Sequence, residues 1–208
     1  MGKSVHSPSL ESLFNQAWAA VGARADKLTG ALIDLPPTAM WGEAGDAEAG
    51  GYDLPVLRYL EEALMLSQDF PLAHLAANFA GCLDRLTWTQ NRAYMEMAKN
   101  QEFLDGYAYA TVCGPQAPIK RAVPMSGFFL MAPNLLYPGH YHPPREVYLI
   151  LTPGARWKLE DGDWFDVKPG DLIFHDHSVV HATRTGDEPF LAFVAWLDAS
   201  SREDISWA

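Results

Sequence analysis

Tyr137-Pro-Gly-His-Tyr-His-Pro-Pro-Arg-Glu-Val-Tyr148 is the stretch that decides how the rest of this 208-residue sequence is interpreted. Alternate side chains of a β-strand share a face, so His140 and His142 should point the same way, as should Glu146 and Tyr148. Two consecutive prolines between these pairs interrupt the strand, so the alternation cannot be carried from one pair to the other. The stretch therefore predicts two imidazoles on one face, followed closely by a carboxylate and a phenol.

Histidines gather around this stretch, since five of the seven lie between positions 140 and 181. Two imidazoles, a carboxylate and a third, distant imidazole form a mixed nitrogen and oxygen donor set. Such a set suits divalent iron, nickel, manganese, zinc or cobalt better than calcium or magnesium. Four protein ligands leave positions open on an ion that can take six, which favours catalysis over a structural role. We therefore expect one divalent transition metal.

The first half of the chain is predicted to be mainly helical. Ser7-Pro8 reads as an N-cap followed by proline at the first helical position. A second helix is expected from about Asp53 to Ser67, after an exposed connection over residues 42–51, and helical spacing returns from Pro71 to about Leu104. Apolar residues at helical spacing mark the first helix: Leu10, Leu13, Phe14, Ala17, Trp18 and Val21.

The second half is predicted to be mainly strand, because past Gly106 short apolar runs are separated by proline and glycine. Between Arg156 and Val167, two runs flank Asp161-Gly162, a dipeptide preferred in two-residue hairpin turns. Another turn is expected at Lys168-Pro169-Gly170-Asp171. Many short strands at this spacing predict an antiparallel sandwich or barrel.

Composition limits the function classes. The chain is 49% hydrophobic and 20% charged, which is typical of a folded globular protein. A formal net charge of −11 without any run of Lys or Arg argues against nucleic acid and anionic membranes as partners. No stretch approaches the roughly 20 consecutive apolar residues of a membrane span, and the beginning of the chain lacks the pattern of a signal peptide. We expect a cytoplasmic protein in which Cys82 and Cys113 are buried free thiols rather than a disulfide.

His-x-His-x-x-x-Glu over residues 140–146, followed by a Pro-Gly-Asp turn at 169–171 and then by His181, resembles the two motifs of the cupin superfamily. This resemblance implies a mainly β fold, the double-stranded β-helix or jelly-roll barrel of the cupins, with an N-terminal helical region. We expect residues 1–108 to form the helical region that packs on the barrel, and residues 109–208 to form the cupin barrel with the metal site.

The second motif departs from the usual cupin pattern. Asp176 and Ser178 stand where a proline and a glycine are common before the last histidine, which puts the geometry of this loop in question more than the ligand itself. His175 and His177 are expected to lie beside the metal ligands or to face solvent rather than to bind the metal.

Two tyrosines bracket the ligands in the pattern Tyr-Pro-x-His-x-His-Pro-x-x-Glu-x-Tyr, which resembles the cupin-type dimethylsulfoniopropionate lyases. Members of that family cleave dimethylsulfoniopropionate to dimethyl sulfide and acrylate. The resemblance extends to three other segments: Gly114-Pro115-x-Ala117-Pro118, Ala132-Pro133 and His181-Ala182-Thr183-Arg184-Thr185. By this resemblance Tyr148 matches a phenol close to the metal and Tyr137 the catalytic base, and four residues match the metal ligands: His140, His142, Glu146 and His181.

The leading hypothesis is therefore a metal-dependent carbon–sulfur lyase that acts by base-catalysed β-elimination on a small zwitterionic substrate. A cupin dioxygenase, which would use iron and leave the tyrosines optional, and a non-catalytic ligand-binding cupin stay open as alternatives. Cupins often pair through barrel edges, so a homodimer is open to this chain. The sulfonium end of the substrate is best held by aromatic faces, for which the sequence offers four candidates: Trp88, Tyr94, Trp157 and Trp196.

Overall fold

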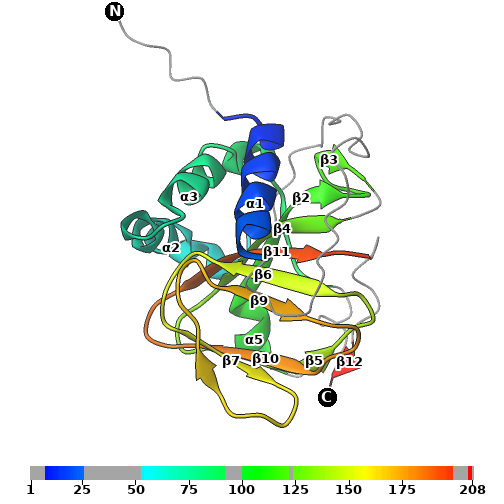
Figure 1. Cartoon of the computed structure of the whole chain (residues 1–208). Coiled ribbons are helices and arrows are strands. Elements are labelled where there is room, and N and C mark those ends of the chain that lie inside the picture. Colours follow the sequence, from blue (N-terminus) through cyan, green and yellow to red (C-terminus); the bar gives the residue numbers. More distant parts are fainter. Residues whose placement is uncertain (1–7, 26–52, 92–99, 122–123, 199–205, 208) are drawn as a thin grey trace, which may run out of the picture.

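The computed structural model describes residues 8–25, 53–91, 100–121, 124–198 and 206–207, and shows two β-sheets that face each other with helices against one of them (Figure 1). The helices are α1 Leu10–Ala25, η2 Pro55–Tyr59, α2 Leu60–Leu66, η3 Ser67–Asp69, α3 Ala73–Ala80, η4 Leu83–Arg85 and α5 Gln101–Asp105. The strands are β1 Trp88–Thr89, β2 Tyr107–Gly114, β3 Ile119–Lys120, β4 Met125–Met131, β5 Leu136–Tyr141, β6 Glu146–Ile150, β7 Ala155–Leu159, β8 Phe165–Asp166, β9 Leu172–His175, β10 His181–Thr185, β11 Phe190–Trp196 and β12 Ser206–Trp207.

The two sheets form a barrel of the cupin type. One has seven strands in the order β1-β2-β4-β11-β6-β9, with β3 beside β2, and the other has five in the order β12-β5-β10-β7-β8. Neighbouring strands are antiparallel except for β2 and β3, which are parallel. The predicted mainly β cupin with N-terminal helices is confirmed. β2 runs across position 108, so the proposed boundary between residues 108 and 109 falls inside a strand. The division of the chain into a helical region and a barrel stays a prediction.

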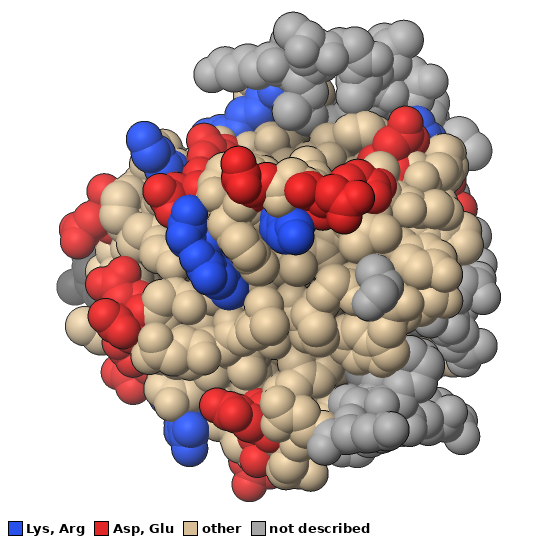
Figure 2. All heavy atoms as spheres, turned by 90° about the horizontal axis from the view of Figure 1, so that it is seen from below, with Lys and Arg blue, Asp and Glu red and all other residues tan. Residues whose placement is uncertain are grey.

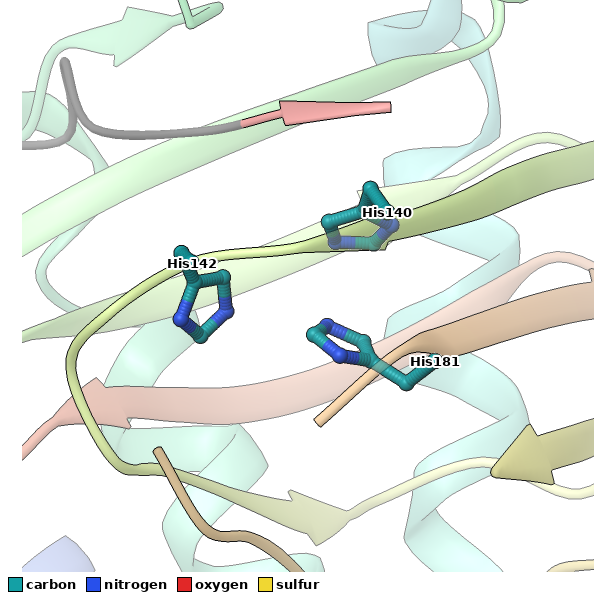
Figure 3. A group of neighbouring side chains, drawn as sticks. All are labelled: His140, His142 and His181. Atoms are coloured by element: carbon teal, nitrogen blue, oxygen red, sulfur yellow. The ribbon is translucent and has the colours of Figure 1, made fainter. Parts of the chain in front are cut away.

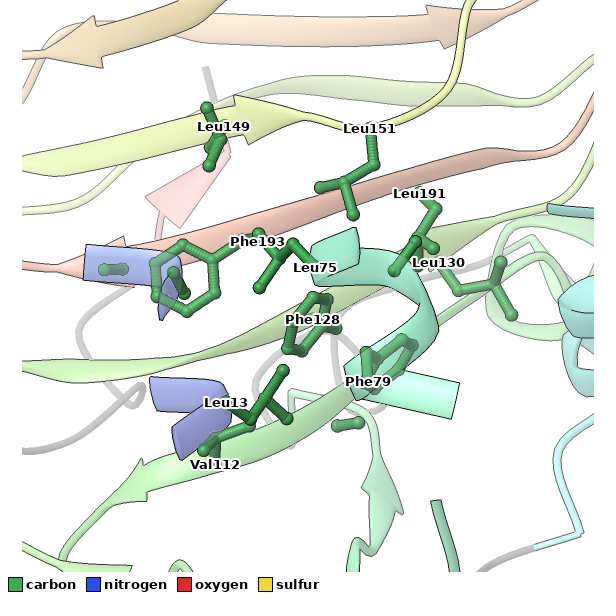
Figure 4. Packing of buried hydrophobic residues seen from close by; sticks show 14 of the residues in the cluster. Leu13, Leu75, Phe79, Val112, Phe128, Leu130, Leu149, Leu151, Leu191 and Phe193 are labelled. Carbon is green, nitrogen blue, oxygen red and sulfur yellow. The ribbon is translucent and has the colours of Figure 1, made fainter. Parts of the chain in front are cut away.

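The seven-stranded sheet is buried on both faces. Every residue of β4 and β11 is buried, which explains why Met-Ser-Gly-Phe-Phe-Leu-Met and Phe-Leu-Ala-Phe-Val-Ala-Trp are apolar throughout instead of alternating. The outer face packs against α1, α2 and α3, where Phe128 stacks on Phe79 with ring centroids 3.8 Å apart and meets Phe193 edge-on at 5.6 Å (Figure 4). The inner face forms a second cluster with side chains of the five-stranded sheet. The helices therefore pack on the outer face of the seven-stranded sheet, away from the barrel interior.

Three predictions about local structure need correction. Helix α1 begins at Leu10, where the Ser9 hydroxyl accepts a hydrogen bond from the Ser12 N–H at 3.0 Å, so Ser9 caps it; Ser7 lies outside the described residues. The helical spacing predicted as far as Leu104 is not continuous: apart from the short helices η4 Leu83–Arg85 and α5 Gln101–Asp105, it stops at Ala80 in α3. Beyond that, residues 88–89 form β1, because they pair with β2 at the edge of the sheet.

The hairpin between β7 and β8 is present, but its turn is not the predicted two-residue turn at Asp161-Gly162. The strands are joined by residues 160–164, and the turn closes with a 3.0 Å bond from the Gly162 N–H to the Leu159 carbonyl. A two-residue turn of the predicted type needs positive φ at both central residues, and here Glu160 alone adopts it, with φ of 48°.

The second predicted turn is confirmed. The Asp171 N–H donates to the Lys168 carbonyl at 2.9 Å, and Gly170 has a φ of 92° at the position that requires it. The prediction for the cysteines is confirmed as well, because Cys82 and Cys113 are both buried and free. Burial raises the pKa of Cys113 to about 11, so this residue is a neutral thiol. No helix in the described part of the chain is long and apolar enough to cross a membrane.

Figure 2 shows the molecule from below, the side on which the five-stranded sheet lies in Figure 1. Acidic side chains form several groups on this face, basic side chains stand among them, and a broad area carries no charge. On β7 and β8, Arg156 and Asp166 form a partly exposed ion pair at 3.0 Å. On β5, Leu136 and Tyr141 turn outward with exposures of 53% and 37%. The outer side of the five-stranded sheet thus carries both charged groups and exposed apolar side chains.

The stacked ring of Phe128 joins the helices to the seven-stranded sheet, so Phe128→Ala should lower the free energy of unfolding by about 3–5 kcal/mol. Urea denaturation followed by circular dichroism would measure the loss. Met65→Ala, at a position that is 62% exposed on α2, should change it by less than about 0.5 kcal/mol. Equal losses in the two variants would show that this aromatic contact does not hold the helices to the sheet.

Candidate metal centre

A β-bulge in β5 places Tyr137 and His140 on the same face of the strand, although they are three residues apart. In the pairing of β5 with β10, His140 lies opposite His181 and Tyr137 lies opposite Thr183, with a register shift between the two pairs. Two residues of β5 thus face a single residue of β10, and the extra residue restores the common orientation. Both Tyr137 and His140 are buried in the barrel interior.

Three of the predicted ligands turn toward one another from β5, the loop after it and the start of β10 (Figure 3). The ring centroids of His140 and His181 are 4.1 Å apart, and those of His142 and His181 are 5.1 Å apart. Each Nδ1 atom lies 2.9 Å from a backbone carbonyl oxygen two residues away: His140 with Pro138, His142 with Pro144 and His181 with Val179. A carbonyl can only accept, so each Nδ1 carries a proton and a neutral ring turns its Nε2 lone pair inward.

Glu146 reaches the same point from the opposite sheet. It opens β6 and is 2% exposed. Its Oε2 lies 3.1 Å from His142 Nε2, 3.0 Å from His175 Nδ1 and 3.3 Å from His181 Nε2. Its Oε1 accepts a hydrogen bond from the Trp196 indole N–H at 2.6 Å. The carboxylate is thus held at both oxygens, and the four predicted ligands are brought together by both sheets.

The charges of this group are set by burial and by Glu146. Burial acts to raise the pKa of Glu146, but the charge of His142 and the hydrogen bonds from His142 and His175 outweigh it and hold that pKa well below its usual range. Burial acts to lower the pKa of His142, but the Glu146 carboxylate raises it above its ordinary value. Burial, together with the neighbouring His181, holds the pKa of His140 well below its usual range. These shifts favour a charged carboxylate at Glu146 and an uncharged ring at His140.

His175 and His177 differ in their surroundings. The indole N–H of Trp157 donates to His175 Nε2 at 2.9 Å, so that nitrogen must be unprotonated, and Nδ1 then donates its proton to Glu146. Burial lowers the pKa of His175 to about 3, in keeping with a neutral ring. His177 has a side chain that is 61% exposed, and its Nδ1 lies 2.7 Å from the Pro143 carbonyl oxygen.

The donor set fits a transition metal ion. His181 Nε2 is fully buried and makes no hydrogen bond among the described residues, although it lies at the centre of the group. The inward nitrogens of His140, His142 and His181 lie within 4.8 Å of one another, as do donor atoms of Glu146, His175 and His181. In the second group both nitrogens of His175 are already engaged, so the three Nε2 atoms and one Glu146 oxygen are the donors that could hold an ion.

The loop before His181 keeps the shape that the usual glycine would give it. Ser178 has a φ of 58°, in the left-handed region that glycine adopts most readily. Its N–H donates to the His142 carbonyl at 3.0 Å, which ties this loop to the loop that carries the second ligand. The serine that departs from the cupin motif thus occupies the glycine conformation itself.

The two tyrosines reach the barrel interior from different sheets, Tyr137 from β5 and Tyr148 from β6, and both rings contact Phe129. Tyr137 has its ring centroid 4.7 Å from that of His140, and its hydroxyl lies 2.9 Å from the hydroxyl of Tyr109. Tyr148 lies two residues after Glu146 on the same face of β6, with its ring centroid 5.7 Å from that of His175. Both phenols are buried, Tyr137 beside the candidate ligand His140 and Tyr148 beside His175.

The aromatic residues proposed for the sulfonium end of the substrate do not all lie in the barrel interior. Trp88 packs against Phe79 in the cluster that faces the helices, so it cannot line the barrel interior. Tyr94 lies outside the described residues, whereas Trp157 and Trp196 do lie in the interior cluster. Sequence reasoning missed the aromatic residues around Tyr137, which are Phe103, Tyr107, Tyr109 and Phe129, and also Trp207 beside Phe103. The alternation of Tyr107 and Tyr109 along β2 was the signal that could have identified two of them.

Comparison with known proteins places this arrangement in a family. The family model described as dimethylsulfoniopropionate lyase matches residues 41–192. The chain belongs to the dimethylsulfoniopropionate lyase family. The matched region contains both tyrosines and all the predicted ligands.

Two curated relatives agree with this membership. Dimethylsulfoniopropionate lyase DddQ of Ruegeria pomeroyi is 36% identical over 95 residues, which are 46% of this chain and 47% of that protein. DddL of Cereibacter sphaeroides, whose assignment as a dimethylsulfoniopropionate lyase is provisional, is 32% identical over 149 residues, which are 71% of this chain and 61% of that protein. The chain thus spans about half to three fifths of the length of the curated relatives it matches.

Two solved structures share the fold across nearly the whole chain. The crystal structure of DMSP lyase DddQ from Ruegeria pomeroyi superposes with a TM-score of 0.70 at 23% identity, covering 96% of this chain and 95% of that one. A structure from the work on the DMSP lyases RdDddP and RnDddQII gives a TM-score of 0.70 at 21% identity, covering 96% and 97%. At this level of identity the likeness establishes the cupin fold with its helical region.

Metal binding should stabilise the fold, because the donors come from both sheets. Metal at about 100 times its Kd should add roughly 2.7 kcal/mol, a rise in Tm of roughly 5–10 °C for a chain of this size. Thermal unfolding with Fe²⁺, Mn²⁺, Co²⁺, Ni²⁺ and Zn²⁺ in turn would measure it. His181→Ala should remove most of the shift, whereas His177→Ala, at an exposed position, should leave it intact. Equal Tm shifts in both variants would show that His181 does not bind the metal.

Proposed function

We propose that this protein is a metal-dependent lyase that cleaves dimethylsulfoniopropionate to dimethyl sulfide and acrylate by β-elimination. The observation that carries the proposal is the meeting of three inward imidazoles and a carboxylate with two buried tyrosines, in a chain that belongs to the dimethylsulfoniopropionate lyase family. His140, His142, Glu146 and His181 would hold one divalent metal, which is Fe, Mn, Ni, Co or Zn.

The bond changes of the reaction match what the site offers. A base removes a proton from the carbon next to the substrate carboxylate, the electron pair forms the carbon–carbon double bond, and the carbon–sulfur bond breaks toward sulfur. Sulfur leaves as neutral dimethyl sulfide, so its positive charge is discharged in the same step. A metal bound in the site would supply positive charge against the negative charge that develops on the carboxylate. No redox cofactor is required.

Tyr137 is the proposed base. With Tyr137 as the proton acceptor, the Tyr109 hydroxyl at 2.9 Å is the donor that stabilises the phenolate, and a hydrogen bond to a charged oxygen is about twice as strong as a neutral one. Tyr148 is the second proposed catalytic phenol, with its ring next to that of His175. Both rings are buried, so the proton transfer would take place away from bulk solvent.

The sulfonium end carries no hydrogen-bond donor, so aromatic faces are its natural partners. The rings of Phe103, Tyr107 and Phe129 have their centroids 5.1–5.5 Å from that of Tyr137. Their position next to the proposed base supports this aromatic group as the place of the dimethylsulfonium group. Trp157 and Trp196 also offer aromatic faces in the interior cluster, next to His175 and Glu146.

Tyr137→Phe should reduce release of dimethyl sulfide from dimethylsulfoniopropionate by about 10²–10⁴-fold, because it removes the group that accepts the proton. Headspace gas chromatography for dimethyl sulfide and liquid chromatography for acrylate would measure both products of the metal-loaded protein. Tyr141→Phe is the matched control, since it removes an exposed hydroxyl from the outer side of β5 and should keep full activity.

The two products should appear in equal amounts and without consumption of oxygen. A Tyr137→Phe variant with metal bound and full activity would refute the assigned base. Metal-loaded wild-type protein that releases neither product would refute the lyase proposal, and oxygen uptake with the substrate would favour the dioxygenase alternative.

A further inference from the structure

One row of side chains crosses the seven-stranded sheet at the metal centre. In the pairing of β6 with β9, Glu146 lies directly opposite His175, and in the pairing of β6 with β11, it lies directly opposite Trp196. Directly opposite residues on neighbouring strands extend their side chains to the same face. His175 and Trp196 therefore flank Glu146 inside the barrel, and both contact its carboxylate.

The two flanking residues contact different oxygens of the carboxylate. The Trp196 indole N–H holds Oε1 at 2.6 Å, and an indole N–H can only donate. Oε2 is the oxygen that faces the Nε2 atoms of His142 and His181, at 3.1 and 3.3 Å, and it also accepts from His175. One oxygen of Glu146 is thus engaged away from the imidazoles, and the other is directed at them.

His175 is itself fixed from the five-stranded sheet. Trp157, on β7, donates its indole N–H to His175 Nε2 at 2.9 Å, and the side chains of both residues are fully buried. Because Nε2 accepts this bond, the proton of His175 must sit on Nδ1, where it points at Glu146 Oε2. A ring flip or a change of tautomer would break both bonds in a buried place, so the orientation of His175 is determined.

We infer that Trp157 and His175 form a positioning relay that, together with Trp196, fixes Glu146 as a ligand through a single oxygen. The inference rests on the metal site of the proposed function and extends it to residues that bind neither metal nor substrate. With Oε1 occupied by Trp196, Glu146 would offer only Oε2 to an ion, which would leave more positions for the substrate carboxylate. His175 is thereby a positioning residue and not a fourth imidazole ligand.

The test compares two substitutions of His175 in the full-length protein loaded with Co²⁺. His175→Asn keeps an N–H donor at the place of Nδ1, whereas His175→Phe keeps a ring of similar shape but no donor. We expect His175→Phe to lower Co²⁺ affinity by about 10–100-fold and to change the visible absorption of bound Co²⁺. His175→Asn should restore most of the affinity and the wild-type spectrum. Competition with a chelator measures the affinity.

Ile173→Val is the matched control for packing, because Ile173 lies two residues before His175 on β9 and packs in the same interior cluster. It should leave both the affinity and the spectrum unchanged. Wild-type affinity and spectrum in His175→Phe would overturn the positioning role. X-ray absorption that shows one imidazole fewer on the metal in both His175 variants would make His175 a ligand and overturn the inference as well.

These readouts need only Co²⁺ and no turnover, so they separate this inference from the proposed function. Wild-type protein whose Co²⁺ binding depends on the His175 donor but which releases no dimethyl sulfide would refute the lyase proposal alone. Protein that releases dimethyl sulfide and binds Co²⁺ equally well in all His175 variants would refute the relay alone. Wild-type protein that binds none of the metal ions would refute both.

Discussion

The rest of this site depends on one constraint: the carboxylate of Glu146 is only 2% exposed and needs partners inside the barrel. A buried charge is costly unless it is paired and hydrogen-bonded, and Glu146 meets this demand through its contacts with His142, His175 and Trp196. These partners come from the loop after β5 and from the strands on either side of β6. The surroundings of Glu146 therefore follow from strand register, and a slip by one residue would turn the carboxylate toward the helices.

The closed barrel is what brings the donors together. His140 and His181 are cross-strand neighbours in the five-stranded sheet, whereas Glu146 belongs to the seven-stranded sheet. The seven-stranded sheet is in turn held from behind by the helices, through contacts such as the stack of Phe79 on Phe128. A site on rigid strands with a packed layer behind it keeps its geometry better than one on loops. The helical half thus contributes to the site without supplying a ligand.

Local pattern in the sequence predicted which side chains gather in the barrel, namely the candidate ligands and the two tyrosines, and it predicted the turn at residues 168–171. It could not place Tyr137 beside His140, because strand alternation puts residues three apart on opposite faces and only the bulge against β10 reverses this. It left His175 undecided for a similar reason, since the partners of that imidazole are set by pairing across three strands and by Trp157 from the facing sheet. These contacts depend on the pairing register of strands that are distant in the sequence, and the periodicity of the sequence does not reveal that register.

Hydrogen bonds within the protein also explain how a chain with several buried histidines can offer a defined site. His140, His142 and His181 each direct Nδ1 at a nearby carbonyl, which leaves Nε2 for an ion, whereas His175 uses both nitrogens within the protein. The cupin fold itself is compatible with many reactions, so it does not select the chemistry. The number of available nitrogens determines how many positions on an ion stay open for substrate. The indole N–H of Trp157, by occupying one nitrogen, therefore helps to set what the site can do, although it lies beyond reach of the ion.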